Sequence, residues 1–373
     1  MRLLLIEPVT KRVQDMGTWP SADAAPLPAP NPGSFYWLSC ERTELEAQLP
    51  QLQTALTQLC GTPLVDLHVS DLLNAHIPST FDYTSDYDVL VFRRLDMAAD
   101  ASAKRSLQSV ETAPVGYAVF DALLLSVHPA QCATRTQSLE RLLAPSSSSA
   151  PEKRTIGSRW PASSADLMLR QVNQMVDGYL NLRRDMAKQI DVWQMQLLNP
   201  KSRFNDWGKV LQARLGLHQL DEICEDQRAA IQDWIDALQT WHDEHSSKTD
   251  HRALELLRVR SRDVLEHIER VLHHVHRLEQ SAEAAMQMHF SAQSNRANDV
   301  MRTLTTITAI FLPLNLIAAV FGMNFDVLPL VHKEDGFWWA MAAMAVIGVV
   351  LLVFFWRRRY IEKASLLGED GDV

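Results

Sequence analysis

The feature that most constrains the fold is a stretch of twenty residues near the carboxy terminus, Phe337–Trp356, without one charged side chain. At about 1.5 Å per residue, a helix of this length crosses the roughly 30 Å hydrocarbon core of a bilayer. A second apolar segment, residues 306–323, precedes it and contains Thr306, Thr308 and Asn315. The two segments predict a pair of transmembrane helices, the first of them unusually polar.

Charges beside these segments predict their orientation, because cytoplasmic flanks carry an excess of lysine and arginine. Basic residues lie before the first segment and after the second, whereas the loop between them is acidic. We therefore expect both termini in the cytoplasm and a short loop outside. The basic residues are Arg296, Arg302, Arg357, Arg358 and Arg359, and the acidic loop residues, expected to attract cations, are Asp326, Glu334 and Asp335.

Bulk composition excludes several classes of function. The net charge of −9 gives no reason to expect nucleic acid as a partner. The four cysteines are scattered without CxxC spacing, so neither a disulfide framework nor a zinc knuckle is indicated. We find no P-loop and expect no nucleotide as a partner, and we find no nucleophile–base set that would indicate an enzyme. No organic cofactor is expected.

The amino-terminal part mixes strand and helix patterns and predicts an α/β domain with a mixed sheet. Strand-like runs lie at residues 2–8, 34–40, 87–95, 115–120 and 123–129. Helix-like segments lie near residues 43–60, 64–76 and 130–144.

After Pro161 the pattern is helical. Ser163 or Ser164 suits the N-cap of a helix that reaches about Leu198. A further helical stretch continues to about His245, with a possible break near Gly216.

From His251 through Leu312 the chain contains neither glycine nor proline. Extended to Phe321, this is one helix of roughly 105 Å, a stalk that runs directly into the first apolar segment. Apolar residues recur along it in a mostly heptad-like pattern, which fits packing either within one subunit or around a symmetry axis. The stripe consists of Leu257, Val264, Ile268, Val271, Val275, Leu278, Ala282 and Ala285.

The end of the first apolar segment carries the tripeptide Gly322-Met323-Asn324, followed by Phe325 and Asp326. Taken alone, the glycine and asparagine would indicate only a helix stop. Together with the α/β domain, the stalk and two carboxy-terminal crossings, they make the chain resemble the CorA-type magnesium transporters. Residues 301–325 follow the family's pattern without a gap, and residues 63–76 and 262–267 match more weakly.

This resemblance implies a fold class: an α/β cytoplasmic domain, a helical bundle with a very long stalk helix, two C-terminal transmembrane helices and a homopentameric pore. It implies a multi-pass protein of a bacterial-type inner membrane, with lipid and copies of itself as partners. The expected segments are a cytoplasmic α/β domain (1–155), a cytoplasmic helical segment (156–249), the stalk with the first transmembrane helix (250–324), a periplasmic loop (325–336), the second transmembrane helix (337–356) and a basic tail (357–373).

The implied function is transport of Mg2+, with Co2+ and Ni2+ as further candidates, through an axial pore driven by the membrane potential. Gly322, Met323 and Asn324 would form the selective mouth, where neutral amides bind a hydrated ion through its water shell. The resemblance places Thr308, Leu312 and Asn315 along the pore wall. It places Met301 and Leu304 at a narrow neck, where apolar side chains close the path by losing water. As helix residues, both could equally be ordinary packing.

Regulation is the task that the resemblance implies for the cytoplasmic domain. Asp71 and Asp263 match positions where divalent cations bind between subunits and hold the pore shut, and Glu266, one turn along, would assist. Mg2+ would thus be both cargo and regulator. Two carboxylates of neighbouring subunits repel unless a cation lies between them. The alternative is that Asp71 and Asp263 are both solvated surface acids.

Two other functions stay open at this point. Histidines at 267, 273, 274 and 276 on the stalk suit zinc, so a zinc transporter of the same superfamily is one alternative. A non-conducting, membrane-anchored sensor or scaffold is the other, although it does not explain threonines and Asn315 inside a crossing. The loop also lacks a glutamate common in the family, reading Leu328-Pro329-Leu330 instead.

Overall fold

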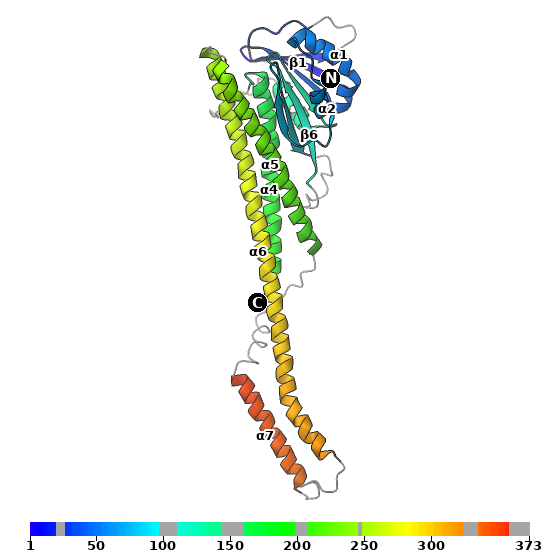
Figure 1. Ribbon diagram of the computed structural model, residues 1–373, viewed down its shortest axis with the longest axis vertical. Helices are drawn as coiled ribbons and strands as arrows, with labels where there is room; N and C mark the ends of the chain where they lie inside the picture. The colour runs from blue at the N-terminus through cyan, green and yellow to red at the C-terminus, as the bar shows by residue number, and fades with distance from the viewer. Residues whose placement is uncertain are drawn as a thin grey trace. The chain divides into compact units, whose positions relative to one another are not determined.

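The computed structural model describes residues 1–19, 27–96, 110–143, 160–198, 207–244, 248–323 and 335–357. These residues form two compact units, Met1–Glu283 and Ala284–Val373. The long helix α6 (Lys248–Phe321) belongs to both, with its amino-terminal part in the first unit and its carboxy-terminal part in the second (Figure 1).

The first unit is built on a seven-stranded mixed sheet with strand order β2-β1-β3-β7-β6-β5-β4. The predicted strands are confirmed, and the two runs around Asp121 and Ala122 pair antiparallel as β6 and β7. Only β3 and β7 pair in parallel. The strands are β1 (Arg2–Glu7), β2 (Arg12–Thr18), β3 (Phe35–Glu41), β4 (Thr80–Tyr83), β5 (Asp88–Leu95), β6 (Thr112–Val119) and β7 (Leu123–His128).

Helices cover both faces of this sheet, as Figure 1 shows. Because side chains alternate along a strand, Leu4 and Trp37 pack into the core beneath the long helices, whereas Leu3 and Leu38 pack beneath α1 and α2. The helices of the first unit, besides α6, are α1 (Arg42–Cys60), α2 (Asp66–Leu73), α3 (Ala133–Leu143), α4 (Ser164–Leu198) and α5 (Trp207–Glu244).

The long helices follow the sequence pattern closely. The Ser163 hydroxyl accepts a hydrogen bond from the Asp166 N–H at 3.2 Å, which is the N-cap expected at the start of α4. Helix α5 continues through Gly216, so the possible break there does not occur. Helix α6 has 74 residues, which corresponds to about 110 Å.

The heptad-like stripe of the stalk packs within the subunit. Val264, Ile268, Val271 and Val275 are buried in the core shared with α4 and α5. Leu257, Leu278 and Ala282 are partly buried against the same core. Of the two readings of the stripe, intrachain packing therefore accounts for it from Leu257 to Ala282.

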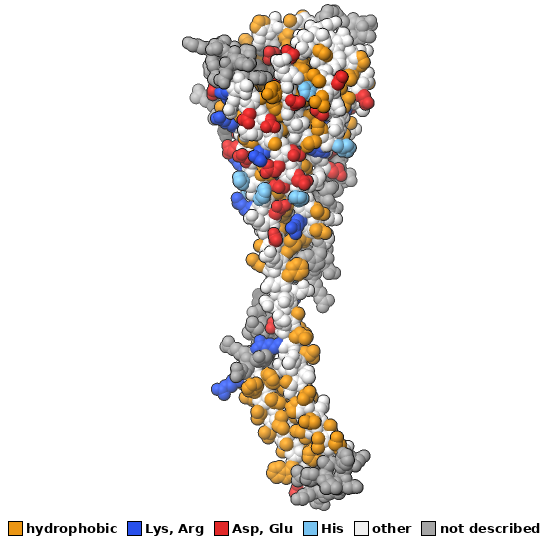
Figure 2. Space-filling view, in the orientation of Figure 1, with side chains coloured by type: hydrophobic (Ala, Val, Ile, Leu, Met, Phe, Trp, Pro, Cys, Tyr) orange, Lys and Arg blue, Asp and Glu red, His pale blue; other side chains and the backbone are white. Residues whose placement is uncertain are grey.

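The second unit contains the carboxy-terminal part of α6 and α7 (Gly336–Arg357). Both helices include a window long and apolar enough to cross a membrane, with mean hydropathies of 2.0 and 2.4. Hydrophobic side chains cover most of the visible surface of these two segments (Figure 2). Soluble surfaces rarely expose so large an apolar area, so lipid or other subunits must cover it.

One residue of the first unit predicts a pH effect on stability. Asp88, at the start of β5, is buried, and neither carboxylate oxygen has a hydrogen-bond partner among the described residues. Burial, and then the charge of Asp121, raises the pKa of Asp88 from 3.8 to about 7. The folded state therefore holds this proton more tightly than the unfolded state does, and the stability it provides is lost as the pH rises from about 4 to about 7.

We expect Asp88→Asn, which keeps a neutral side chain at every pH, to be more stable than the wild type at pH 8 by up to about 4 kcal/mol. The advantage should shrink steadily towards pH 4. Thermal unfolding of the full chain in detergent between pH 4 and pH 8 measures it. Asp86→Asn, at an exposed carboxylate two residues earlier, is the control and should show no pH-dependent difference.

Candidate functional site

Helix α6 has two different faces along the apolar segment from Thr306 to Ile317. At 100° per residue, one face is buried or half-buried, and its residues are Thr306, Ala309, Ile310, Pro313, Leu314 and Ile317. Gly348 of α7 lies against this face, since a Cβ there would be 3.9 Å from Leu314 Cδ1. The half-buried residues of α7 recur with helical spacing, at Ala340, Met344, Ile347, Gly348, Leu351 and Phe355. The two apolar helices thus pack face to face.

The opposite face of α6 carries the residues expected to line the pore. Met301, Leu304, Thr308, Leu312 and Asn315 fall within about 40° of one line along the helix. All five are exposed in the single chain, the apolar three with 62%, 57% and 65% of their surface accessible. The five residues predicted to line the pore therefore lie on the side of α6 opposite to the side that α7 covers.

Threonine hydroxyls on this helix are bonded to their own backbone. Thr308 Oγ1 donates to the Leu304 carbonyl at 2.9 Å, and Thr305 Oγ1 donates to the Met301 carbonyl at 2.8 Å. Thr306 makes the same bond to Arg302. This satisfies the donors inside an apolar environment and leaves hydroxyl lone pairs, so Thr308 presents an acceptor rather than a donor on the exposed face.

At its carboxy-terminal end, α6 stops at Phe321, directly before Gly322. The Gly322 N–H still donates to the Ala318 carbonyl at 2.9 Å, and the Met323 N–H donates to the Val320 carbonyl at 3.3 Å. A Cβ at position 322 would lie 3.2 Å from the Ala318 carbonyl oxygen. That oxygen also accepts the Gly322 N–H, so the contact belongs to the last helical turn, and Gly322 does not adopt a left-handed conformation.

The rest of the predicted mouth lies outside the described residues: Asn324, Asp326 and Glu334, and beyond α7 also Arg358 and Arg359. Asp335 is described, and its carbonyl accepts the Trp339 N–H at 3.1 Å in the first turn of α7. Arg357 is the last residue of α7.

The predicted regulatory acids lie on two elements of the first unit. Asp71 is half-buried on α2, whereas Asp263 and Glu266 are exposed on α6. Asp263 Oδ1 is 3.8 Å from His267 Nε2, and Glu266 pairs with Arg270 at 2.7 Å. Within the described part of one chain, no group of three or more His, Cys, Asp or Glu side chains is placed to hold a metal. Metal binding at these acids would need ligands from a second copy or from water.

Helix α2 is held by contacts that sequence reasoning missed. The buried His68 bonds through Nδ1 to the Tyr87 hydroxyl at 2.9 Å and through Nε2 to Asp82 at 3.1 Å. The Val65 N–H, at the start of the helix, also donates to the Tyr87 hydroxyl at 2.8 Å. On the next turn, the Leu72 side chain fills the space where Gly116 of β6 has no Cβ. Asp71 therefore sits on a short helix that is fixed to the sheet on both sides.

The stalk histidines are engaged separately. His267 Nδ1 is 3.3 Å from Asn173 Oδ1, and His276 Nδ1 is 3.0 Å from the Leu272 carbonyl. Burial and nearby arginines lower the pKa of His274. Along the described part of the stalk they form no zinc-type cluster within one chain.

Comparison with known proteins decides the family. Residues 32–359 match the model of the CorA-like Mg2+ transporter protein family, which is most of the chain. The protein belongs to this family. The expected resemblance is confirmed, and so is the architecture of an α/β domain, a long helix and two apolar carboxy-terminal helices.

Individual CorA relatives are distant in sequence. The cobalt/magnesium transport protein CorA of Thermotoga maritima is 25% identical over 195 residues, which cover 52% of each chain, so the match spans about half of that relative. The complete structure of the CorA magnesium transporter from Methanocaldococcus jannaschii superposes over 97% of this chain and 99% of its own, with a TM-score of 0.64 and 16% identity. The ZntB cytoplasmic domain from Vibrio parahaemolyticus gives a TM-score of 0.52 and 15% identity over 80% and 98%. At these identities the structural matches speak for the fold alone.

Proposed function

We propose that this protein is a channel-like transporter of divalent cations, with Mg2+ as its main cargo and Co2+ and Ni2+ as further candidates. Five copies surround an axial pore in an inner, plasma-type membrane, with both termini in the cytoplasm. The supporting observation is the division of α6 into a face covered by α7 and an exposed face that carries Met301, Leu304, Thr308, Leu312 and Asn315.

The exposed face suits a water-filled cation path and not a lipid contact. A residue such as Asn315 facing hydrocarbon would leave its amide without partners, which is costly. Around a shared axis, the same side chain and the Thr308 lone pairs would meet the water shell of an ion. Mg2+ releases its water reluctantly, so uncharged oxygen acceptors that bind the shell suit permeation better than a carboxylate ring.

Met301 and Leu304 would form the closed neck at the cytoplasmic end of this path. Their exposure in one chain means that another surface covers them in the assembly, and copies of the same face would do so. Asn324, with Gly322 and Met323, would form the outer mouth, and Asp326, Glu334 and Asp335 would attract cations to it. Arg357, Arg358 and Arg359 would anchor the cytoplasmic end of α7.

Closure would depend on intracellular Mg2+ bound between Asp71 of one subunit and Asp263 of the next, assisted by Glu266. The exposure of Asp263 and the firm attachment of α2 support this arrangement, because a site between subunits needs accessible carboxylates on rigid elements. Loss of the cation would leave unbalanced negative charge and loosen the interface.

Flux in liposomes tests the proposal. Purified protein in vesicles that contain a Mg2+-sensitive dye should pass Mg2+ inward under an inward-negative potential, since two charges gain about 4.6 kcal/mol per 100 mV. Hexaamminecobalt, which mimics a hydrated ion but cannot lose its ligands, should block this flux. The absence of Mg2+ flux would refute the proposal. Zn2+ flux that a proton gradient drives and hexaamminecobalt does not block would favour a zinc transporter of the same fold.

A further inference from the structure

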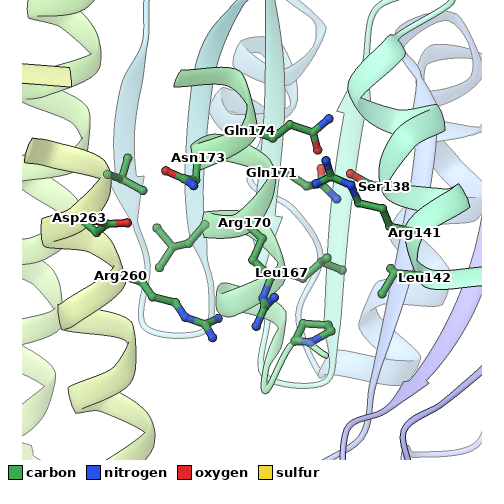
Figure 3. Close-up of a pocket in the computed structure, with 13 residues that line it drawn as sticks. Ser138, Arg141, Leu142, Leu167, Arg170, Gln171, Asn173, Gln174, Arg260 and Asp263 are labelled. Atoms are coloured by element: carbon green, nitrogen blue, oxygen red, sulfur yellow. The ribbon is translucent and has the colours of Figure 1, made fainter. Parts of the chain in front are cut away.

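A cavity in the first unit has a lining that the transport pathway does not use. It measures about 340 Å³ and lies where α3, α4 and α6 meet. Figure 3 shows side chains from all three helices directed towards it. The volume is within the range of small-molecule sites, which begins at about 300 Å³.

The lining carries more positive than negative charge. Arg141 of α3, Arg170 of α4 and Arg260 of α6 line the cavity together with Asp263, and among the described residues the buried Asp166 is the acid that pairs with two of them. Arg170 and Arg260 both pair with Asp166, Arg170 Nε at 3.3 Å. Arg141 has no ion-pair partner among the described residues. Counted over these described groups, three guanidinium groups and two carboxylates leave one positive charge, and the arginine without a paired acid is the exposed Arg141.

A buried hydrogen-bond donor also lines the cavity. Gln171 is 1% exposed, and its Oε1 accepts the Tyr117 hydroxyl at 3.0 Å. In this arrangement the Nε2 end of the amide has no partner among the described residues. An unpaired buried donor is costly, so a ligand that brings an acceptor to it would be favoured. In Figure 3 this amide points towards Ser138 and Arg141.

Apolar side chains also line the cavity, between the polar ones: Pro161, Leu142, Leu167, Leu169 and Val264. A bare inorganic ion would leave these side chains without a contact. A ligand that joins an anionic group to a flat or apolar body would contact both kinds of side chain. Guanidinium, amide and hydroxyl donors around one point suit the several terminal oxygens of a phosphate.

We propose that this cavity binds a small organic phosphate of about the size of a nucleoside monophosphate. The phosphate would contact Arg141, Gln171 Nε2 and Ser138, and the organic part would lie against the apolar side chains of the lining. Arg170 and Arg260, held by Asp166, would add charge without being free to turn away.

Asp263 connects this cavity with the proposed Mg2+ sensing. Asp263 lines the cavity, and its carboxylate contacts His267, which in turn contacts Asn173 of α4. An anion in the cavity would change the electrostatic surroundings of the carboxylate to which we assign Mg2+ sensing. This consequence rests on the proposed function, whereas the binding itself does not.

Calorimetric titration of the full-length protein in detergent, with EDTA and without Mg2+, tests the binding. Adenosine monophosphate is the probe, and adenosine and inorganic phosphate are the comparison ligands. We expect adenosine monophosphate to bind at least tenfold more tightly than either. Arg141→Ala, a change at an exposed side chain, and Gln171→Glu, which keeps the acceptor for Tyr117, should each weaken binding tenfold or more. Arg262→Ala removes an exposed arginine outside the cavity and should leave binding unchanged.

Several outcomes would overturn the proposal: no binding of adenosine monophosphate at millimolar concentration, binding as tight for inorganic phosphate, or equal loss in the Arg262 variant. A further outcome would also overturn it: the wild type shows no heat of binding, and Arg141→Ala forms a smaller oligomer than the wild type in light scattering. Arg141 would then pair with an acidic residue of a neighbouring subunit and not with a phosphate. Liposome flux is measured separately, so failure here leaves the transport proposal intact, and failure of transport leaves this binding test valid.

Discussion

Replacing Asn324 by alanine is expected to reduce Mg2+ flux through proteoliposomes about a hundredfold or more. In a pentamer the change removes five amide acceptors from one ring. If each contributes about 1 kcal/mol to holding the water shell of the ion, losing even three costs more than a hundredfold in occupancy. The measurement is the initial rate of dye-detected Mg2+ entry at fixed potential, with the amount of reconstituted protein determined in the same vesicles.

Asn295→Ala is the matched control for this prediction. It makes the same chemical change on an exposed part of α6, about 120° away from the face that carries Met301. Its flux should stay near that of the wild type. Asn324→Asp adds a second comparison, since a carboxylate ring should bind the ion more tightly and slow its release. A wild-type rate for Asn324→Ala would favour the non-conducting scaffold over the pore.

The sequence predicts the fold well wherever one pattern dominates. The buried strands β3, β5, β6 and β7 have apolar runs that only a covered sheet explains, and the structure has them where the sequence predicts. The edge strand β2 and the short β4 were missed. Strand β2 is exposed over nearly all of its length and so has no apolar face, and four residues in β4 are too few to show alternation.

The candidate site is harder to predict from the sequence, because it depends on which helix faces pack against each other. Periodicity along α6 could not separate packing within a subunit from packing around an axis, and the answer came from the burial of Val264 and Val271 beneath α4 and α5. Nor does the sequence indicate that α7 covers the Leu314 side of α6 and leaves the Asn315 side open. The attachment of α2 by Tyr87 joins residues far apart in the chain, and no local pattern carries that signal.

The roles of Gly322, Asn324, Asp71 and Asp263 remain predictions that experiment must test. Asn324 lies outside the described residues, and the two acids belong to a site that a single chain does not complete.

A second large effect is expected where α2 meets the sheet. At Gly116, in the interior strand β6, a Cβ would lie 2.4 Å from Leu72 Cδ2. Leu72 is 2% exposed, so its side chain has little room to move aside. Gly116→Val should therefore push α2 away from the sheet and destabilise the first unit by about 1–3 kcal/mol. Thermal unfolding of the full chain measures the loss.

The same displacement should impair regulation, because Asp71 directly precedes Leu72. If Mg2+ closes the pore between Asp71 and Asp263, the Mg2+ concentration that protects the protein from protease should rise about tenfold in Gly116→Val. Gly178→Ala is the control, since its Cβ would meet only Leu95 at 3.7 Å in ordinary contact. Alanine in the interior of α4 should leave the stability equal or raise it by up to about 1 kcal/mol, and Mg2+ protection should stay unchanged. Unaltered Mg2+ protection in a clearly destabilised Gly116→Val protein would contradict a sensor on α2.

Combining Gly116→Val with Leu72→Ala separates the steric cause from a general loss of stability. Each change alone should destabilise, the first by crowding and the second by leaving a cavity. In the double variant the valine fills the space that the shortened side chain vacates. Its free energy of unfolding should therefore exceed the value expected from adding the two single losses by about 1 kcal/mol or more. Mg2+ protection should recover with it, since α2 could return to the sheet with Asp71 in its original position. Recovery of stability without recovery of Mg2+ protection would show that Asp71 acts elsewhere than in cation sensing.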